Sequence, residues 1–357
     1  MITCDAIVLA ALHQLPNVEK VVVHDPGDYE VRVKMVASGI CHTDIGYMTY
    51  ARTTPILLGH EGAGIVEKIG AHVRHVQVGD HVVINWLAKC GECLRCRSGH
   101  ADWCEKPLST AEPRLFWRDQ PLTPMSNAGT FCEYAVVPAK GAIPIRKDIP
   151  LQTVATLGCA VATGVGAAIH TANVQPYETV VVIGAGGVGL NVIQGARLRL
   201  VQRIIAVDID DERLLLARKF GATETVNSNQ QSLVETVFAL TEGRGADHVF
   251  EVVGRPEVMA QGLQVLTRGG AMTLIGAADR EAVLSFKPRR FMAEQHRLLG
   301  SVYGNVFPEV DFPLYANWYK QGNLLLDELH TETVTLADVT SVFAREKQRG
   351  GRTIVKF

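Results

Sequence analysis

Residues 179–189, TVVVIGAGGVG, decide the fold of the second half of the chain. A β-branched run leads into Gly184, Gly186 and Gly189, which fit the pattern Gly-x-Gly-x-x-Gly, and a helical pattern follows to about Leu200. Glycines at this spacing let main-chain amides approach a pyrophosphate at the N-terminus of a helix. A tight turn without a ligand is the alternative, but the strand before the loop and the helix after it favour nucleotide binding.

A second signal for a nucleotide is Asp208, which ends the strand-like run at residues 203–207 and lies 19 residues after Gly189. A carboxylate at this place hydrogen-bonds the 2′-hydroxyl of an adenosine ribose. It would repel the 2′-phosphate of NADP, so the predicted cofactor is NAD. The residues of this glycine loop predicted to contact the cofactor are Gly184, Gly186, Gly187, Val188 and Gly189.

Strand-like and helical segments alternate from about residue 176 onwards. A helix is predicted at 210–220, strands are predicted at 248–253 and 271–275, and a further helix lies between these strands. Such alternation predicts a parallel, doubly wound sheet of the Rossmann type in an α/β fold.

The first 150 residues follow a different pattern. Short apolar runs, such as 31–36 and 81–84, are separated by turn signals such as Val78-Gly79-Asp80. This pattern predicts an irregular, mostly β domain. The length of 357 residues fits about two domains.

Composition excludes several classes of protein. Lys and Arg number 35 against 37 Asp and Glu, a net charge of −2, so the basic excess of a nucleic-acid-binding protein is missing. No run reaches about 18 unbroken apolar residues, and no membrane span is expected. The first five residues lack the basic region of a secretory signal, which favours a cytoplasmic location.

Four cysteines lie within 15 residues, in a segment that we call the cysteine lobe (residues 90–104). They are Cys90, Cys93, Cys96 and Cys104. Four thiolates suit a structural Zn²⁺ ion, and because they leave no open coordination position, such an ion would hold the loop rather than perform chemistry. Reduced thiols and an iron–sulfur site are the alternatives.

Three further candidate ligands, Cys41, His60 and Cys159, are scattered along the chain. One histidine and two cysteines would form a three-ligand zinc site with an open position, the arrangement of a catalytic metal. Spacing does not show that they meet, and each could be an ordinary buried residue. Thr43, two residues after Cys41, carries a hydroxyl that could pass on the proton of an alcohol.

Taken together, these motifs resemble the zinc-dependent alcohol dehydrogenases of the medium-chain dehydrogenase/reductase family over almost the whole chain. The resemblance is carried by GICHTD at 39–44, GHEGAG at 59–64, VGDHV at 78–82, LGC at 157–159, the cysteine lobe and the glycine loop. It implies a mostly β, GroES-like catalytic domain formed by residues 1–160 and 303–357. It also implies an NAD-binding Rossmann domain at 161–302, and a homodimer or homotetramer.

The resemblance also assigns roles around the metal. Cys41, His60 and Cys159 would hold the catalytic zinc, and Thr43 would be the first group of the proton relay. Asp44 would brace His60, and Glu61 would lie just behind the metal.

For the cofactor, the resemblance implies that His42 and Arg352 face the pyrophosphate and that Arg213 lies near the adenosine ribose. Trp86 would line the substrate pocket beside the zinc.

Two departures from the family pattern matter. Gly46 stands where many members carry a histidine that ends the proton relay, and the loop at 46–55 is short. Residues 105–129 resemble both the thiol-dependent formaldehyde dehydrogenases and the aryl-alcohol dehydrogenases of the family.

The predicted function is reversible oxidation of a primary alcohol to an aldehyde with NAD, with aromatic and allylic alcohols as candidates. Oxidation of a thiol–formaldehyde adduct is the alternative. A nucleotide-binding zinc or redox sensor without turnover is a different class, and a count of two zinc ions per chain would argue against it.

Overall fold

The computed structural model describes residues 1–345 and 350–357, which form two compact units. Unit 1 comprises Met1–Cys159 and Phe307–Phe357, and unit 2 comprises Ala160–Val306. The second boundary lies four residues after the predicted one, because the turn Tyr303–Asn305 packs on helix α4 (Ala160–Gly166) of unit 2.

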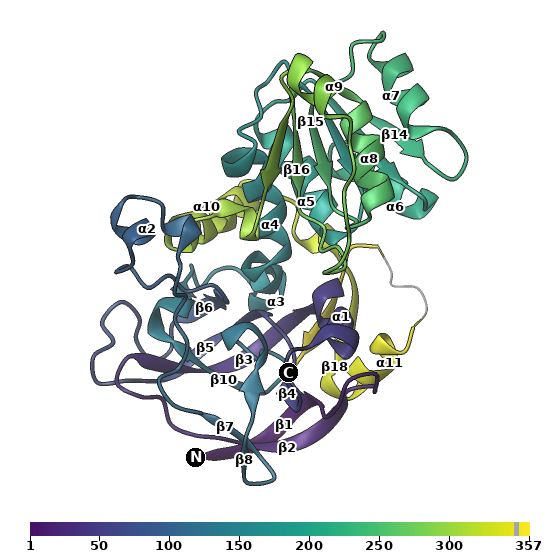
Figure 1. The fold of residues 1–357 in the computed structure, drawn as a ribbon. Helices are drawn as coiled ribbons and strands as arrows, with labels where there is room; N and C mark the ends of the chain where they lie inside the picture. The colour runs from purple at the N-terminus through teal and green to yellow at the C-terminus, as the bar shows by residue number, and fades with distance from the viewer. Residues whose placement is uncertain (346–349) are drawn as a thin grey trace. The chain divides into compact units, whose positions relative to one another are not determined.

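Unit 2 is built on a parallel sheet, in which every neighbouring pair of strands runs in the same direction (Figure 1). In spatial order the strands are β14 (Glu224–Asn227), β13 (Arg203–Asp208), β12 (Thr179–Ile183), β15 (Ala246–Glu251), β16 (Leu266–Leu274) and β17 (Arg297–Gly300). The strand order reverses between β12 and β15, and ligands of such sheets bind outside the carboxyl ends of the strands at this point. The predicted Rossmann-type fold is confirmed.

The helices of unit 2 begin and end at recognisable signals. Helix α6 starts after Asp210, whose side chain accepts a hydrogen bond from the amide of Glu212, and ends at Gly221 with a φ of +117°. The other helices are α4, α5 (Gly187–Leu198), α7 (Leu233–Leu240), α8 (Pro256–Gln264) and α9 (Pro288–Ala293).

Two strands of unit 2 have bounds that differ from the prediction. Strand β16 begins at Leu266, five residues before the predicted start at residue 271, and strand β15 begins at Ala246, two residues before residue 248. Strand β15 ends at Glu251, two residues before the predicted end at Val253. The Glu251 carboxylate accepts hydrogen bonds from the amides of Val253 and Gly254, at 2.9 and 2.7 Å, and these bonds hold the next residues in a turn.

Unit 1 contains two largely antiparallel sheets. The first has the order β8 (Gln120–Pro121), β7 (Leu115–Trp117), β2 (Asn17–Val23), β1 (Ile2–Leu9), β4 (Ile56–Leu57) and β9 (Thr123–Pro124). The second has the order β11 (Ala142–Pro144), β6 (His81–Ile84), β5 (Glu61–Ile69), β3 (Glu30–Ile40), β19 (Arg352–Lys356) and β18 (His330–Thr335), and β10 (Tyr134–Pro138) also pairs with β3. The predicted mostly β domain is therefore confirmed.

Helices complete unit 1, and the longest of them is α10 with 13 residues. They are α1 (His42–Tyr50), α2 (Leu94–Arg97), α3 (Leu151–Val154), α10 (Pro308–Lys320) and α11 (Val339–Phe343). Among the described residues, no single helix is long and apolar enough to cross a membrane; the short helical segments at 151–158 and 160–171 would reach that length only together.

Candidate active site

The pairing of two strands brings the first two candidate ligands together. Strand β3 ends at Ile40, directly before Cys41, and strand β5 begins at Glu61, directly after His60. The two strands are antiparallel, and Gly39 lies opposite Glu61 in the register. Cys41 and His60 therefore leave the same end of this strand pair. Cys159 joins them because the 3₁₀ turn before it, Ala155–Gly158, packs against β3, β5 and β6.

The chain reaches His60 through a turn that requires glycine. Gly59 has a φ of +93°, and a Cβ atom there would lie 2.5 Å from the amide nitrogen of Phe131. A side chain at this position would therefore be both strained and too close to the neighbouring backbone. This turn aims the imidazole of His60 at the two cysteines.

The resulting cluster offers the ligand atoms of a metal site. One ligand atom from each of Cys41, His60, Glu61 and Cys159 lies within 4.8 Å of all the others. All four residues are buried, and His60 is only 3% exposed. Two sulfurs and an imidazole nitrogen are donors that zinc prefers.

Asp44 fixes the orientation of the imidazole. Its Oδ1 lies 3.0 Å from Nδ1 of His60, and its Oδ2 accepts a 2.7 Å hydrogen bond from the amide of Cys41. The second bond also caps helix α1. With Nδ1 held by a carboxylate, Nε2 is the nitrogen left for a metal, an arrangement that raises ligand basicity in known metal sites.

The ligand cluster also contains an arginine. Cys41, His60, Glu61 and Cys159 lie together, and Arg352 contacts two of them, Glu61 and Cys41. Arg352 lies 3.3 Å from Oε1 of Glu61 and 3.7 Å from the sulfur of Cys41. A hydrogen bond with Cys159 and the charge of Arg352 hold the pKa of Cys41 well below its ordinary value. The two sulfurs and the imidazole nitrogen of this cluster form a donor set that fits zinc.

Burial also affects the other carboxylate of the cluster. Removal from solvent raises the pKa of Glu61 to about 7, although Arg352 opposes this shift.

Two residues predicted around the metal, Thr43 and Trp86, contact its candidate ligands. The hydroxyl of Thr43 is 3.5 Å from the sulfur of Cys41. The ring of Trp86 meets that of His60 edge-on, with 6.3 Å between their centroids. His42 is the first residue of α1 and is exposed, and its predicted contact with a pyrophosphate stays a prediction.

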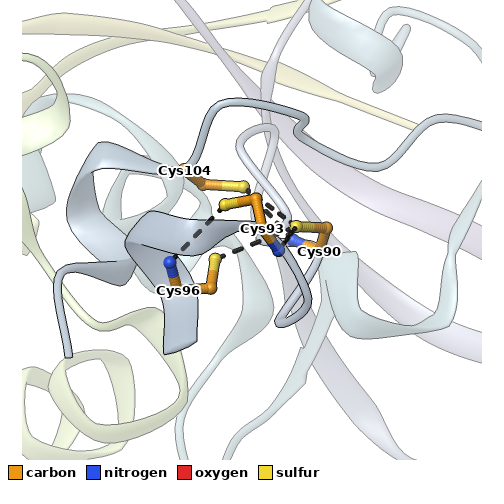
Figure 2. Close-up of side chains that lie close together, drawn as sticks. All are labelled: Cys90, Cys93, Cys96 and Cys104. Carbon is orange, nitrogen blue, oxygen red and sulfur yellow. Dashed lines mark hydrogen bonds between the residues drawn. The ribbon is translucent and has the colours of Figure 1, made fainter. Parts of the chain in front are cut away.

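The cysteine lobe forms a second donor set in unit 1 (Figure 2). The sulfur of Cys90 lies 3.5 Å from that of Cys104 and 3.9 Å from that of Cys96. Four sulfurs around a tetrahedral zinc with bonds of about 2.3 Å would be about 3.8 Å apart. Main-chain amides point at these sulfurs, and the amide of Cys96 lowers the pKa of Cys93 to about 6. The spacing and the amide dipoles both fit a closed thiolate site.

The glycine loop lies between β12 and α5. A Cβ atom on Gly189 would lie 1.8 Å from the carbonyl oxygen of Gly184, so helix α5 can approach the strand only with glycine here. A Cβ atom on Gly186 would meet nothing within 4 Å. The loop is therefore tightly packed at Gly189 and has free space in front of Gly186. This space lies beside the first main-chain amides of α5, where an anion can approach.

Asp208 is tied to this loop. One carboxylate oxygen accepts a 2.7 Å hydrogen bond from the amide of Ala185, and the other accepts bonds from Ile209 and Asp210. Arg213 lies 3.9 Å from the same carboxylate. The loop and the predicted ribose-binding residue thus form one connected unit.

Sequence reasoning missed two arrangements. It placed Arg352 at the cofactor, whereas the structure shows its guanidinium against Glu61 and Cys41; the predicted contact with the pyrophosphate stays a prediction. It also did not single out Tyr50, whose ring covers Gly46. The four-residue spacing of Gly46 and Tyr50 on one helix was the available signal.

Comparison with known proteins agrees with this site. The model of the alcohol dehydrogenase GroES-like domain matches residues 27–147, and that of the zinc-binding dehydrogenase family matches residues 187–320. The probable S-(hydroxymethyl)glutathione dehydrogenase 1 of Schizosaccharomyces pombe is 37% identical over 96% of this chain and 93% of its own length. Alcohol dehydrogenase 1 of Pisum sativum is 33% identical over 91% and 89%.

A solved structure is similar over its full length. Benzyl alcohol dehydrogenase from Acinetobacter calcoaceticus has a TM-score of 0.93 and 30% identity, and the match covers 100% of both chains. The donor sets and these matches confirm the predicted zinc, and the choice of NAD rather than NADP stays a prediction. The chain belongs to the zinc-dependent alcohol dehydrogenases of the medium-chain dehydrogenase/reductase family.

Proposed function

We propose that this protein reversibly oxidises primary alcohols to aldehydes with NAD, at a zinc ion held by Cys41, His60 and Cys159. The observation that carries the proposal is the buried cluster of these three side chains, with Asp44 fixing the imidazole at 3.0 Å. A structural zinc needs four protein ligands, whereas these three would leave a position for substrate while Glu61 stays paired with Arg352 at 3.3 Å.

The proposed reaction turns an alcohol and NAD⁺ into an aldehyde, NADH and a proton. When bound, zinc supplies Lewis-acid polarisation of the alcohol oxygen. Thr43 takes the alcohol proton through its hydroxyl, which can accept and donate a hydrogen bond at the same time. The glycine loop binds the pyrophosphate with main-chain amides, and Asp208 selects NAD over NADP because a 2′-phosphate would meet a like charge.

A Thr43→Val variant tests this role of the hydroxyl. Valine keeps the shape of threonine but cannot accept a proton. We expect at least a hundredfold lower turnover in alcohol oxidation, measured by NADH formation, at the lower end of the usual contribution of about 10²–10⁴ from general acid–base catalysis. Unchanged turnover near neutral pH would exclude this role.

The preference for primary alcohols rests on Trp86. Its indole lies edge-on to His60 and would crowd a second substituent on the carbinol carbon. We expect a primary alcohol to have a higher kcat/KM than the matched secondary alcohol, and the Trp86→Ala variant to reduce this difference. Equal kcat/KM values for both alcohols in the wild-type enzyme would refute the argument.

Oxidation of a thiol–formaldehyde adduct is the second candidate. It is favoured by the S-(hydroxymethyl)glutathione dehydrogenase of S. pombe at 37% identity. Such an adduct carries a CH₂OH group and is itself a primary alcohol, so the same site could perform the reaction. Formaldehyde oxidation that requires added glutathione would support this candidate, and equal rates with and without the thiol would reject it.

A further inference from the structure

Two cysteines of the described chain lie outside both candidate metal sites, which use the other six. They are Cys4 and Cys132, and their sulfur atoms are 3.5 Å apart although 128 residues separate them in sequence. Both side chains are buried, with exposures of 2% and 0%. Because the sulfurs of a disulfide are about 2.05 Å apart, a small movement would bring this pair to bonding distance.

The two cysteines are held differently by the main chain. Cys4 lies inside strand β1, in a ladder with β2 that runs from Ile2 to Val8. Cys132 lies outside the named strands and meets β1 through an isolated bridge with Ala6. We therefore expect Cys132 to move towards Cys4 when a bond forms, and β1 to stay in place.

The segment that would move supports the turn before His60. The amide of Thr130 donates a hydrogen bond of 3.0 Å to the carbonyl oxygen of Gly59, and the amide of Phe131 donates one of 3.0 Å to that of Leu58. These two residues directly precede Cys132, so a shift of Cys132 reaches the turn that aims the imidazole of His60.

We propose that Cys4 and Cys132 form a reversible disulfide in the presence of a hydroperoxide, and that this bond slows alcohol oxidation by displacing the turn before His60. The formation of the bond does not depend on the proposed function. Its effect on the rate rests on that function, because it needs a reaction at His60 to slow down.

The oxidation is balanced with hydrogen peroxide as the oxidant. The sulfur of Cys4 attacks one peroxide oxygen, the O–O bond breaks, and a sulfenic acid and water are formed. The sulfur of Cys132 then attacks the sulfur of Cys4, the S–O bond breaks, and the departing oxygen takes the proton of the Cys132 thiol and leaves as water. The two thiols lose two electrons in total, and the peroxide is reduced to two water molecules.

The surroundings of the pair fit this order of steps. The hydrogen bond between the two thiols lowers the pKa of Cys4 and raises that of Cys132. Since the thiolate is the reactive form, Cys4 is the sulfur that attacks first. The burial of both sulfurs favours a small oxidant such as hydrogen peroxide over a bulky one such as glutathione disulfide.

The bond is tested first, on the zinc-loaded protein and without substrate. After treatment with hydrogen peroxide, peptide mapping by mass spectrometry should show the Cys4 peptide joined to the Cys132 peptide, and a phosphine reductant should separate them. Cys4→Ser and Cys132→Ser should each lack this link. Sulfenic or sulfinic acid at Cys4 without the link, or no reaction of either cysteine, would overturn the proposal.

The effect on the reaction is measured on the wild-type protein once the link is complete. We expect an about tenfold lower kcat for NADH formation, because a misplacement of about 1 Å can cost up to about a hundredfold in rate. The phosphine should restore the rate. Cys132→Ser, treated in the same way, is the matched control and should keep its kcat. The zinc content of both proteins should stay constant, which excludes oxidation of the metal ligands as the cause.

The outcomes separate the claims. A complete link with unchanged kcat would overturn the coupling to His60, and an equal reversible loss of rate in Cys132→Ser would show that another residue is responsible. A wild-type enzyme that is inactive before any oxidation, with zinc bound at both sites, would instead overturn the proposed function, although the disulfide would still form.

Discussion

The Asp44→Asn substitution tests how the protein orients the metal ligands His60 and Cys41. Asp44 is fully buried and accepts two hydrogen bonds, from Nδ1 of His60 at 3.0 Å and from the amide of Cys41 at 2.7 Å. Asparagine keeps the size of the side chain but has only one accepting oxygen. Its NH₂ group must then face one of the two donors.

The expected loss follows from these two bonds. A hydrogen bond to a charged group contributes about 1.5–3 kcal/mol, and one such bond is lost. Since about 1.4 kcal/mol corresponds to a factor of ten, zinc affinity at this site should fall about 10–100-fold, the usual range for a group that orients a metal ligand. Helix α1 also loses part of its cap, at a cost of about 1 kcal/mol in stability.

Zinc affinity can be measured by competition with a chromophoric chelator. The phase of zinc release that disappears in a Cys41→Ala/Cys159→Ala double variant belongs to this site. Asp338→Asn is a matched control, because Asp338 forms the same kind of cap with Thr335 in a region without metal ligands. Equal zinc release from Asp44→Asn and from wild type would refute the reasoning.

Three further predictions concern other parts of the chain. Gly189→Ala should unfold unit 2, because its Cβ would lie 1.8 Å from a carbonyl oxygen. Gly186→Ala should fold normally, because its Cβ would meet nothing within 4 Å, but it should bind NAD more weakly. Circular dichroism measures the folding of both variants, and calorimetric titration measures their affinity for NAD. Cys93→Ser should lower the zinc content by one ion per chain and make the cysteine lobe sensitive to proteolysis, while zinc at Cys41 remains. Burial lowers the pKa of His330 from 6.5 to about 4, so the unfolded chain binds a proton first as the pH falls below 6.5. At pH 5 the free energy of unfolding should therefore have lost about 2 kcal/mol relative to pH 7, a loss that His330→Gln should remove in urea titrations.

Local patterns predicted much of unit 2. Strand β12 (Thr179–Ile183) has the predicted bounds, because a short β-branched run that ends at a glycine turn strongly favours a strand. Helix α6 was predicted to within one residue from its cap and its final glycine. Strand β15 was misplaced by two residues, because Val252 and Val253 are apolar but lie in a turn held by a buried carboxylate.

The contacts of the site depended on pairing across the chain. Cys41 and His60 meet through the register of β3 and β5, and no local pattern shows this register. Only the family resemblance predicted that the two residues meet. Arg352 contacts Glu61 although 291 residues separate them in sequence. The four-residue spacing of Gly46 and Tyr50 on one helix was a local signal for their contact, but a pattern of residue types does not give the direction of a side chain.

The number of metal ions bound per chain tests the central claim most directly. Elemental analysis of the purified wild-type protein should give two zinc ions per chain. The Cys41→Ala/Cys159→Ala double variant should give one, with the ion of the cysteine lobe retained. A single zinc in the wild-type protein, or two in the double variant, would contradict the assignment of a metal to Cys41, His60 and Cys159.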